Sequence, residues 1–120
     1  MDPHFDGVIF KTHAGEVRRR IRAPFPPYRI VDVRTREEYD RGHIPGALSA
    51  PPEGIHALPD GTDDRTEFIV VGQQPEDPAM RAASLALRFL GVRRVVELTG
   101  GMVEWERAGG PLEGSAQRAA

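Results

Sequence analysis

The apolar positions of the chain alternate between two patterns. Short continuous apolar runs are typical of buried strands, whereas apolar residues three or four positions apart are typical of amphipathic helices. The runs predict strands at 8–10, 28–33, 47–49, 68–71 and 95–98. The helical spacing predicts helices at 13–22, 35–39, 78–90 and 102–108. Strands separated by helices predict an α/β fold with a parallel sheet covered on both faces.

Capping residues and prolines support these boundaries. Thr12 is the expected N-cap of the first helix, which the proline-rich segment 23–27 must end because proline lacks an amide donor. Thr35 is the expected cap of the second helix. Asp77 followed by Pro78 combines an N-cap acceptor with proline at the first helical position, which favours a helix start.

Two segments carry more specific expectations. In helix 78–90 the polar residues form one narrow stripe, made of Arg81, Ser84 and Arg88, so the apolar remainder predicts a mostly buried helix. Residues 51–66 are rich in acidic residues, proline and glycine, which predicts an exposed connection with one turn at Ile55–Leu58.

Composition limits the class of protein. The chain has 120 residues, 39% hydrophobic and 28% charged, which fits one globular domain over 1–114 with a frayed tail at 115–120. A net charge of −2 favours neither nucleic acid nor a membrane surface as partner. No apolar stretch approaches the roughly 20 residues that cross a bilayer, and no signal peptide is visible, so a cytoplasmic location is expected.

Three ordered motifs carry a family resemblance. They are Ile30-Val-Asp-Val-Arg34 with Glu37-Glu-Tyr39 and Gly42-His-Ile-Pro-Gly-Ala47; the helix from Ala82 to Gly91; and Leu98-Thr-Gly-Gly-Met-Val-Glu-Trp105 with Gly109 and Pro111. In order and spacing they resemble the signatures of the rhodanese family. The resemblance implies the rhodanese-like three-layer sandwich, a central parallel sheet of about five strands with helices on both faces.

The chain departs from the family at the catalytic loop. Active rhodaneses place a cysteine after the central strand, but this chain contains no cysteine at all. The position of that cysteine is taken by Gln73 or Gln74, depending on where one inserted residue is placed in the alignment with the family. A carboxamide cannot act as a nucleophile or carry a persulfide, so sulfurtransferase activity is not expected and no catalytic residue is assigned.

The residues after the missing cysteine also differ from a sulfur site. Such a loop binds anions through free amides at a helix N-terminus. Here Pro75 and Pro78 each remove a donor, while Glu76 and Asp77 add negative charge. The altered loop 73–79 is therefore a candidate contact surface, with Gln73, Gln74, Glu76 and Asp77 as its binding residues.

The remaining motif residues favour structural roles. They are Asp32, Arg34, Glu38, His43, Gly100, Gly101 and Trp105. Asp32 is either a general base or, as we favour, a buried carboxylate paired with Arg34 or a backbone amide. Arg34 itself is expected to pair with Glu38 or Glu37.

Several residues have both a chemical and a structural interpretation. Glu76 and Asp77 form either an acid/base pair or helix caps, and the caps are favoured. The glycines of 99–101 form either a phosphate site or a tight turn, and the turn explains them fully. His43 is expected to be a hydrogen-bonded scaffold residue and Trp105 a core anchor.

Metal and cofactor sites are not expected. His4, His13, His43 and His56 lack the spacing of metal ligands. The basic segment 18–22 is interpreted as a solvated helix face, with contacts to RNA, an acidic protein or a membrane as alternatives.

Three function classes remain open. The first and favoured one is a catalytically inactive rhodanese-like module that acts by binding or regulation. The second is a sulfurtransferase-related enzyme that depends on a partner's cysteine, and the third is an enzyme of unrelated chemistry in the same pocket. A protein partner of unknown identity is expected, and a homodimer stays open.

Overall fold

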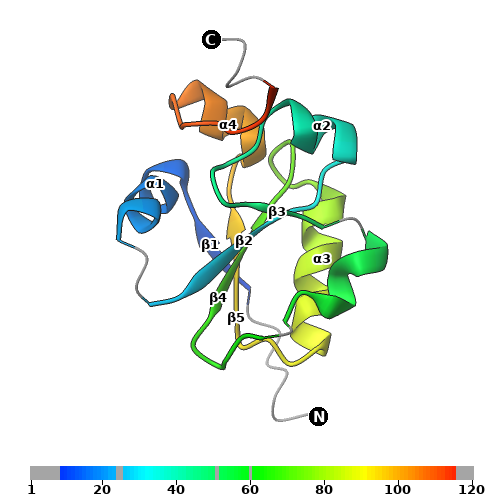
Figure 1. Ribbon diagram of the computed structural model, residues 1–120. Helices are drawn as coiled ribbons and strands as arrows, with labels where there is room; N and C mark the ends of the chain where they lie inside the picture. The colour runs from blue at the N-terminus through cyan, green and yellow to red at the C-terminus, as the bar shows by residue number, and fades with distance from the viewer. Residues whose placement is uncertain (1–8, 24–25, 51, 60, 116–120) are drawn as a thin grey trace.

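A five-stranded parallel sheet forms the centre of the molecule. The computed structural model describes residues 9–23, 26–50, 52–59 and 61–115. The strands lie in the order β1-β5-β4-β2-β3, and every neighbouring pair is parallel (Figure 1). Their bounds are β1 Phe10–Thr12, β2 Tyr28–Asp32, β3 Leu48–Ser49, β4 Glu67–Val71 and β5 Arg94–Leu98.

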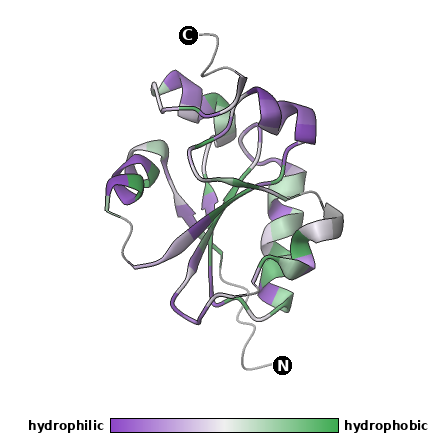
Figure 2. Ribbon diagram, viewed as in Figure 1, coloured by the Kyte–Doolittle hydropathy of each residue, from purple (hydrophilic) through white to green (hydrophobic). Residues whose placement is uncertain are grey.

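Helices cover both faces of this sheet. The cluster on one face takes residues from α1 (Ala14–Arg22), α2 (Arg36–Arg41) and α4 (Gly101–Arg107). The cluster on the other face takes residues from α3 (Pro78–Phe89) and the 3₁₀ helix η1 (Pro52–Ala57). The three-layer sandwich predicted from the sequence is therefore confirmed. Figure 2 shows the apolar colouring concentrated on the central strands and α3, with α2 strongly polar.

The start of the chain differs from the prediction. The first strand lies two residues later than the predicted 8–10, and Val8 lies outside the described residues. Thr12 belongs to that strand and pairs with Leu98, so it cannot also cap the helix. His13 is the N-cap instead, because its ring Nδ1 accepts a hydrogen bond from the Glu16 amide at 3.3 Å.

The prediction of a mostly buried α3 was wrong. Half of its residues are exposed, Arg81 among them, and the other two residues of the polar stripe face inward. Ser84 is 0% and Arg88 5% exposed, whereas Phe89 is 80% exposed. Burial of the two polar side chains is tolerated because backbone carbonyls accept their hydrogen bonds. Ser84 donates to the Met80 carbonyl, and Arg88 donates to the carbonyls of Val92 and Arg93.

Trp105 anchors α4 to the sheet, as predicted. Its side chain is 0% exposed, and its indole N–H donates to the Pro111 carbonyl at 2.9 Å. A Cβ at Gly110 would lie 2.3 Å from the indole ring, so only glycine allows the chain to turn back over it.

The connection before β4 and the chain end complete the fold. The predicted turn at Ile55–Leu58 is present, with the Leu58 amide bonded to the Ile55 carbonyl at 3.2 Å. It continues η1, which is longer than the single turn expected. In the predicted tail, the Ser115 hydroxyl donates to the Asp40 and Arg41 carbonyls, and 116–120 lie outside the described residues. None of the described helices is long and apolar enough to cross a bilayer.

Candidate functional site

Asp32 and Arg34 form a buried ion pair at the end of β2. Arg34 donates from Nε and Nη2 to the Asp32 carboxylate, at 3.0 and 2.8 Å, and its backbone amide donates to Oδ1 at 3.0 Å. The side chains are 6% and 1% exposed. In an extended segment, residues two apart point to the same side, which brings the two groups together. The predicted pairing of Asp32 with Arg34 is confirmed.

The predicted pairing of Arg34 with Glu38 or Glu37 was wrong. Glu38 and Thr35 instead form a capping box at the start of α2, in which Oε1 of Glu38 accepts from the Thr35 amide at 3.2 Å. In return, the Thr35 hydroxyl accepts from the Glu38 amide at 3.2 Å. The sequence contained this signal, a threonine followed three residues later by glutamate.

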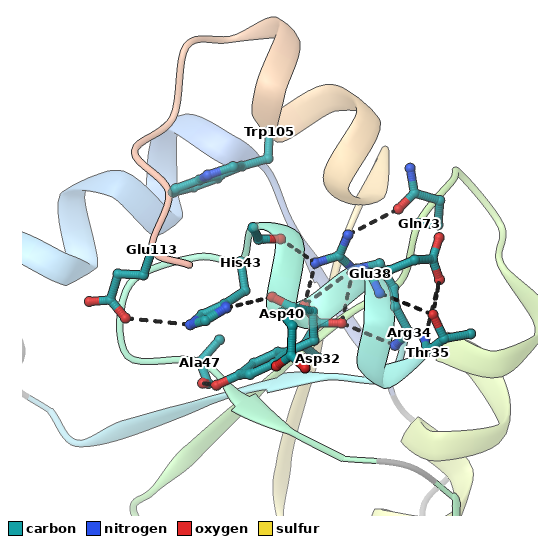
Figure 3. A network of polar contacts seen from close by, with 12 residues as sticks. Asp32, Arg34, Thr35, Glu38, Asp40, His43, Ala47, Gln73, Trp105 and Glu113 are labelled. Carbon is teal, nitrogen blue, oxygen red and sulfur yellow. Dashed lines mark hydrogen bonds and ion pairs between the residues drawn. The ribbon is translucent and has the colours of Figure 1, made fainter. Parts of the chain in front are cut away.

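Arg34 also connects three segments of the site. Its Nη2 donates to the Gly42 carbonyl at 2.7 Å, and its Nη1 donates to Oε1 of Gln73 at 3.2 Å. Figure 3 shows Arg34 between Asp32 and the Gln73 side chain. The guanidinium therefore ties β2, the end of α2 and the loop after β4 to one another.

His43 occupies a scaffold position next to this network. Its ring stacks on Tyr39 with centroids 3.8 Å apart, and its Nδ1 lies 2.8 Å from the Tyr39 carbonyl oxygen. The backbones of His43 and Glu113 exchange two hydrogen bonds at 2.9 and 2.8 Å. The Glu113 carboxylate also lies 3.5 Å from Nε2 of the His43 ring (Figure 3). These contacts attach the C-terminal segment to α2 and leave His43 without the exposed, substrate-facing position of a catalytic base.

The loop after β4 is fastened to α4 through its carbonyl groups. The Met102 amide donates to Gly72 O at 2.9 Å, and the Val103 amide donates to Gln73 O at 3.1 Å. Gly101, at φ 61°, makes this approach possible, because a Cβ there would lie 2.7 Å from Gly72 O. The tight turn predicted at 99–101 is thus present, and the Thr99 amide donates to the Thr12 carbonyl at 2.9 Å.

The Asp77 carboxylate accepts hydrogen bonds from two backbone amides of the loop. Oδ2 accepts from the Gln73 amide and Oδ1 from the Ala79 amide, both at 2.9 Å. Gly72 lies directly beneath, since a Cβ there would be 2.8 Å from Oδ2. Asp77 is thus the predicted helix cap, and it also places an internal anion where a substrate anion would need donors.

The structure does not bring the four loop candidates together in one cavity. Gln73 lines a cavity of about 510 Å³ together with Arg34, Glu38, Arg41, Gly42, Glu106 and Ser115. Glu76 and Asp77 line a second cavity, of about 580 Å³, next to α3 and β5. Gln74 is exposed and lines neither. The loop is therefore a partition between two polar cavities.

The second cavity contains a buried carboxylate that sequence reasoning missed. Glu97 of β5 is 1% exposed and accepts two hydrogen bonds at 2.9 Å from Arg81, with Lys11 3.5 Å away. Burial opposes ionisation, but the hydrogen bonds from Arg81 and the charges of Arg81 and Lys11 outweigh it. The pKa of Glu97 therefore lies below its ordinary value. An acidic residue inside the otherwise apolar run 95–98 was the available signal.

The Glu97 carboxyl should make the domain less stable in acid. A carboxyl whose folded-state pKa is depressed stabilises the fold above its unfolded pKa, and this contribution is lost as pH falls through the folded value. We expect the free energy of unfolding to decline below about pH 4.5, and less steeply in a Glu97→Gln variant. Urea unfolding from pH 7 to pH 3 measures this, with exposed Asp64→Asn as control. Equal slopes for Glu97→Gln and the unchanged chain would contradict it.

Comparisons with known proteins decide the family. The Rhodanese-like domain model matches residues 13–108. The chain belongs to this family. The rhodanese-like domain is 38% identical to the HTH-type transcriptional regulator Rv0324 of Mycobacterium tuberculosis over 88 residues, which cover 72% of this chain and 38% of the regulator. It therefore spans well under half the length of that relative.

For two further relatives, the match to this chain covers most of the relative's length. Thiosulfate sulfurtransferase 16, chloroplastic, of Arabidopsis thaliana is 31% identical over 99 residues, covering 72% of this chain and 80% of that protein. The crystal structure of the BH2092 protein from Bacillus halodurans superposes with a TM-score of 0.80 at 28% identity, covering 89% and 78% of the two chains. The predicted family membership is confirmed.

This rhodanese-like domain has no cysteine thiol, the group that reacts in sulfur transfer. The chain has no cysteine, and the side chain that faces the first cavity from the loop is the Gln73 carboxamide. The described residues also contain no group of three or more His, Asp or Glu side chains placed to hold a metal ion. The first cavity is lined by hydrogen-bond donors and carboxylates and contains no thiol.

Proposed function

We propose that this rhodanese-like domain is a catalytically inactive binding or regulatory module, and that the altered loop 73–79 is part of its contact surface. The observation that carries the proposal is the Asp77 carboxylate, which accepts from the Gln73 and Ala79 amides at 2.9 Å. A carboxylate at these donors opposes an anionic sulfur donor by charge and by occupancy.

The loop also has the properties of a preformed contact surface. Gln74, Pro75 and Glu76 are exposed, while Gly72 and Gln73 hold the loop base to α4 through the two carbonyl contacts. A segment that is already ordered loses little conformational entropy when a partner binds. The exposed tip can therefore present fixed side chains to a protein partner.

The two enzymatic alternatives have less support. A cysteine borrowed from a partner would still need free amide donors at the loop, and Asp77 engages two of them. Acid/base chemistry by Glu76 and Asp77 would need a free carboxylate on Asp77, but both of its oxygens accept backbone hydrogen bonds.

A comparative capture experiment tests the binding role. The native chain and a variant with 73–77 replaced by a Gly-Ser segment of equal length are immobilised and exposed to extract of the source cells. We expect specific proteins to be retained by the native chain and lost from the variant, with Arg65→Ala, an exposed site outside both cavities, behaving as native. Thermal melts establish that each variant is folded. Equal retention by the folded loop variant would contradict a role for the loop.

A further inference from the structure

Acidic side chains gather at one end of the molecule. The helices α2 and α4 and the loop 73–77 lie together beyond the carboxyl ends of the strands (Figure 1). They contain seven acidic and three basic side chains, a net charge of −4 against −2 for the whole chain. The acidic ones are Glu37, Glu38, Asp40, Glu76, Asp77, Glu104 and Glu106, and the basic ones are Arg36, Arg41 and Arg107.

Five of these carboxylates form no ion pair with a described residue. Asp40 pairs with Arg36 and Glu104 with Arg107, each within one helix. Within the described part of the chain, no ion pair involves Glu37, Glu38, Glu76, Asp77 or Glu106, and the oxygens of Asp77 accept from backbone amides. This end of the molecule therefore has a negative field that the chain itself does not balance.

Two of these five carboxylates line the first cavity. Glu38 lies on its α2 side and Glu106 on its α4 side, around a volume of about 510 Å³. Arg34 and Arg41 also line it, and Asp32 balances the charge of Arg34. Glu38, Glu106 and Arg41 then leave one negative charge in excess. A cavity of this size accommodates a side chain together with part of a backbone.

The cavity also contains a buried donor with capacity to spare. The guanidinium of Arg34 has five N–H groups; one on Nε and two on Nη2 point to Asp32 and Gly42, and one on Nη1 points to Gln73. The second N–H of Nη1 has no acceptor among the described residues, although the side chain is only 6% exposed. The Gln73 carboxamide turns its oxygen to Arg34 and its nitrogen away from it (Figure 3), and that nitrogen also donates to no described residue. Neutral carbonyl oxygens suit both donors.

We propose that this cavity binds a segment of the partner protein that carries lysine or arginine, with the cationic side chain between Glu38 and Glu106 and a backbone carbonyl at Arg34 and Gln73. The proposal rests on the binding role proposed above and adds the chemistry of the partner. Charge complementarity of this kind speeds encounter and selects the partner by sign.

The test uses two short fluorescent peptides and the full chain. One peptide alternates Lys and Ala, the other alternates Glu and Ala, and both have blocked ends. Fluorescence anisotropy should detect binding of the Lys peptide alone. Raising the ionic strength from about 0.15 M to about 1 M, which shortens the Debye length from about 8 to about 3 Å, should weaken that binding about tenfold.

Charge-neutralising variants locate the binding. Glu38→Gln with Glu106→Gln should raise the Kd for the Lys peptide at least about tenfold, the effect of roughly two lost ion pairs. Glutamine at position 38 keeps the capping box, so the fold is retained. Glu16→Gln with Asp64→Asn changes the net charge equally at a different cavity and should leave the Kd within about twofold.

The outcomes separate the two proposals. Binding of the Glu peptide equal to that of the Lys peptide, or an unchanged Kd in the Glu38 and Glu106 double variant, would overturn the cationic-partner proposal. Such a result, together with loop-dependent capture and absence of sulfur transfer, would leave the binding module standing with a different partner chemistry. Sulfur transfer by the native chain would instead overturn the proposed function itself.

Discussion

Replacing Arg34 with methionine is expected to lower the free energy of unfolding by about 3–5 kcal/mol, the largest stability effect that the site predicts. The reason is the Asp32 carboxylate, which is 1% exposed and depends on Arg34 for its side-chain hydrogen bonds. Without the guanidinium, one buried charge keeps only the Arg34 backbone amide as donor. The variant also loses the contacts to Gly42 and Gln73.

Urea unfolding at pH 7 measures this effect, and Arg36→Met is the matched control. Arg36 also pairs with an aspartate, Asp40, but its side chain is 74% exposed, so its loss should change stability by under about 1 kcal/mol. Arg34→Lys should fall between the two, because an ammonium group cannot hold the carboxylate with a planar fork. Equal unfolding free energies for Arg34→Met and Arg36→Met would show that the buried pair does not stabilise the domain.

The second large effect concerns catalysis. A Gln73→Cys or Gln74→Cys variant is expected to show no appreciable thiosulfate sulfurtransferase turnover. A thiol at either position would meet the negative charge of Glu76 and Asp77, which raises the pKa of a thiol and disfavours the reactive thiolate. The Gln73 and Ala79 amides are bound to Asp77, and Pro75 and Pro78 have no amide donor.

The size of this effect follows from the missing donors. Loss of one donor that stabilises a developing anion typically slows an enzyme by about 10²–10³, so loss of several leaves little activity. A graft of the whole 73–79 segment from a cysteine-containing rhodanese loop should restore turnover, since the sheet and α4 that support the loop are in place. Strong turnover by either point variant would mean that the loop is still preorganised for sulfur.

Much of the fold followed from local patterns in the sequence. The continuous apolar run of β4 and the Asp77–Pro78 helix start located the centre of the domain correctly. The inward position of Ser84 and Arg88 on α3 could not be predicted. Ser84 donates to the Met80 carbonyl of its own helix, and Arg88 to carbonyls of the chain that follows the helix. A helical pattern alone does not distinguish a polar face that meets water from one that meets buried acceptors.

The site was predicted in its residues but not in its contacts. Asp32, Arg34 and Gln73 were all identified, yet the partner of Arg34 was not Glu38, because local capping by Thr35 took that carboxylate first. The buried ion pair of Glu97 was also not predicted, since its partner Arg81 lies on α3 and Glu97 on β5. Sequence spacing showed which groups are present, and packing decided which of them meet.

Sulfur transfer from thiosulfate to cyanide by the native 120-residue chain is the measurement that decides whether this rhodanese-like domain is catalytically inactive. The Arabidopsis relative named thiosulfate sulfurtransferase 16 serves as positive control, assayed at the same protein concentration. We expect no turnover above the buffer rate, because the chain has no cysteine and Asp77 binds two of the loop amides. Turnover by the native chain would show that the domain is not inactive and that a group other than a cysteine transfers sulfur.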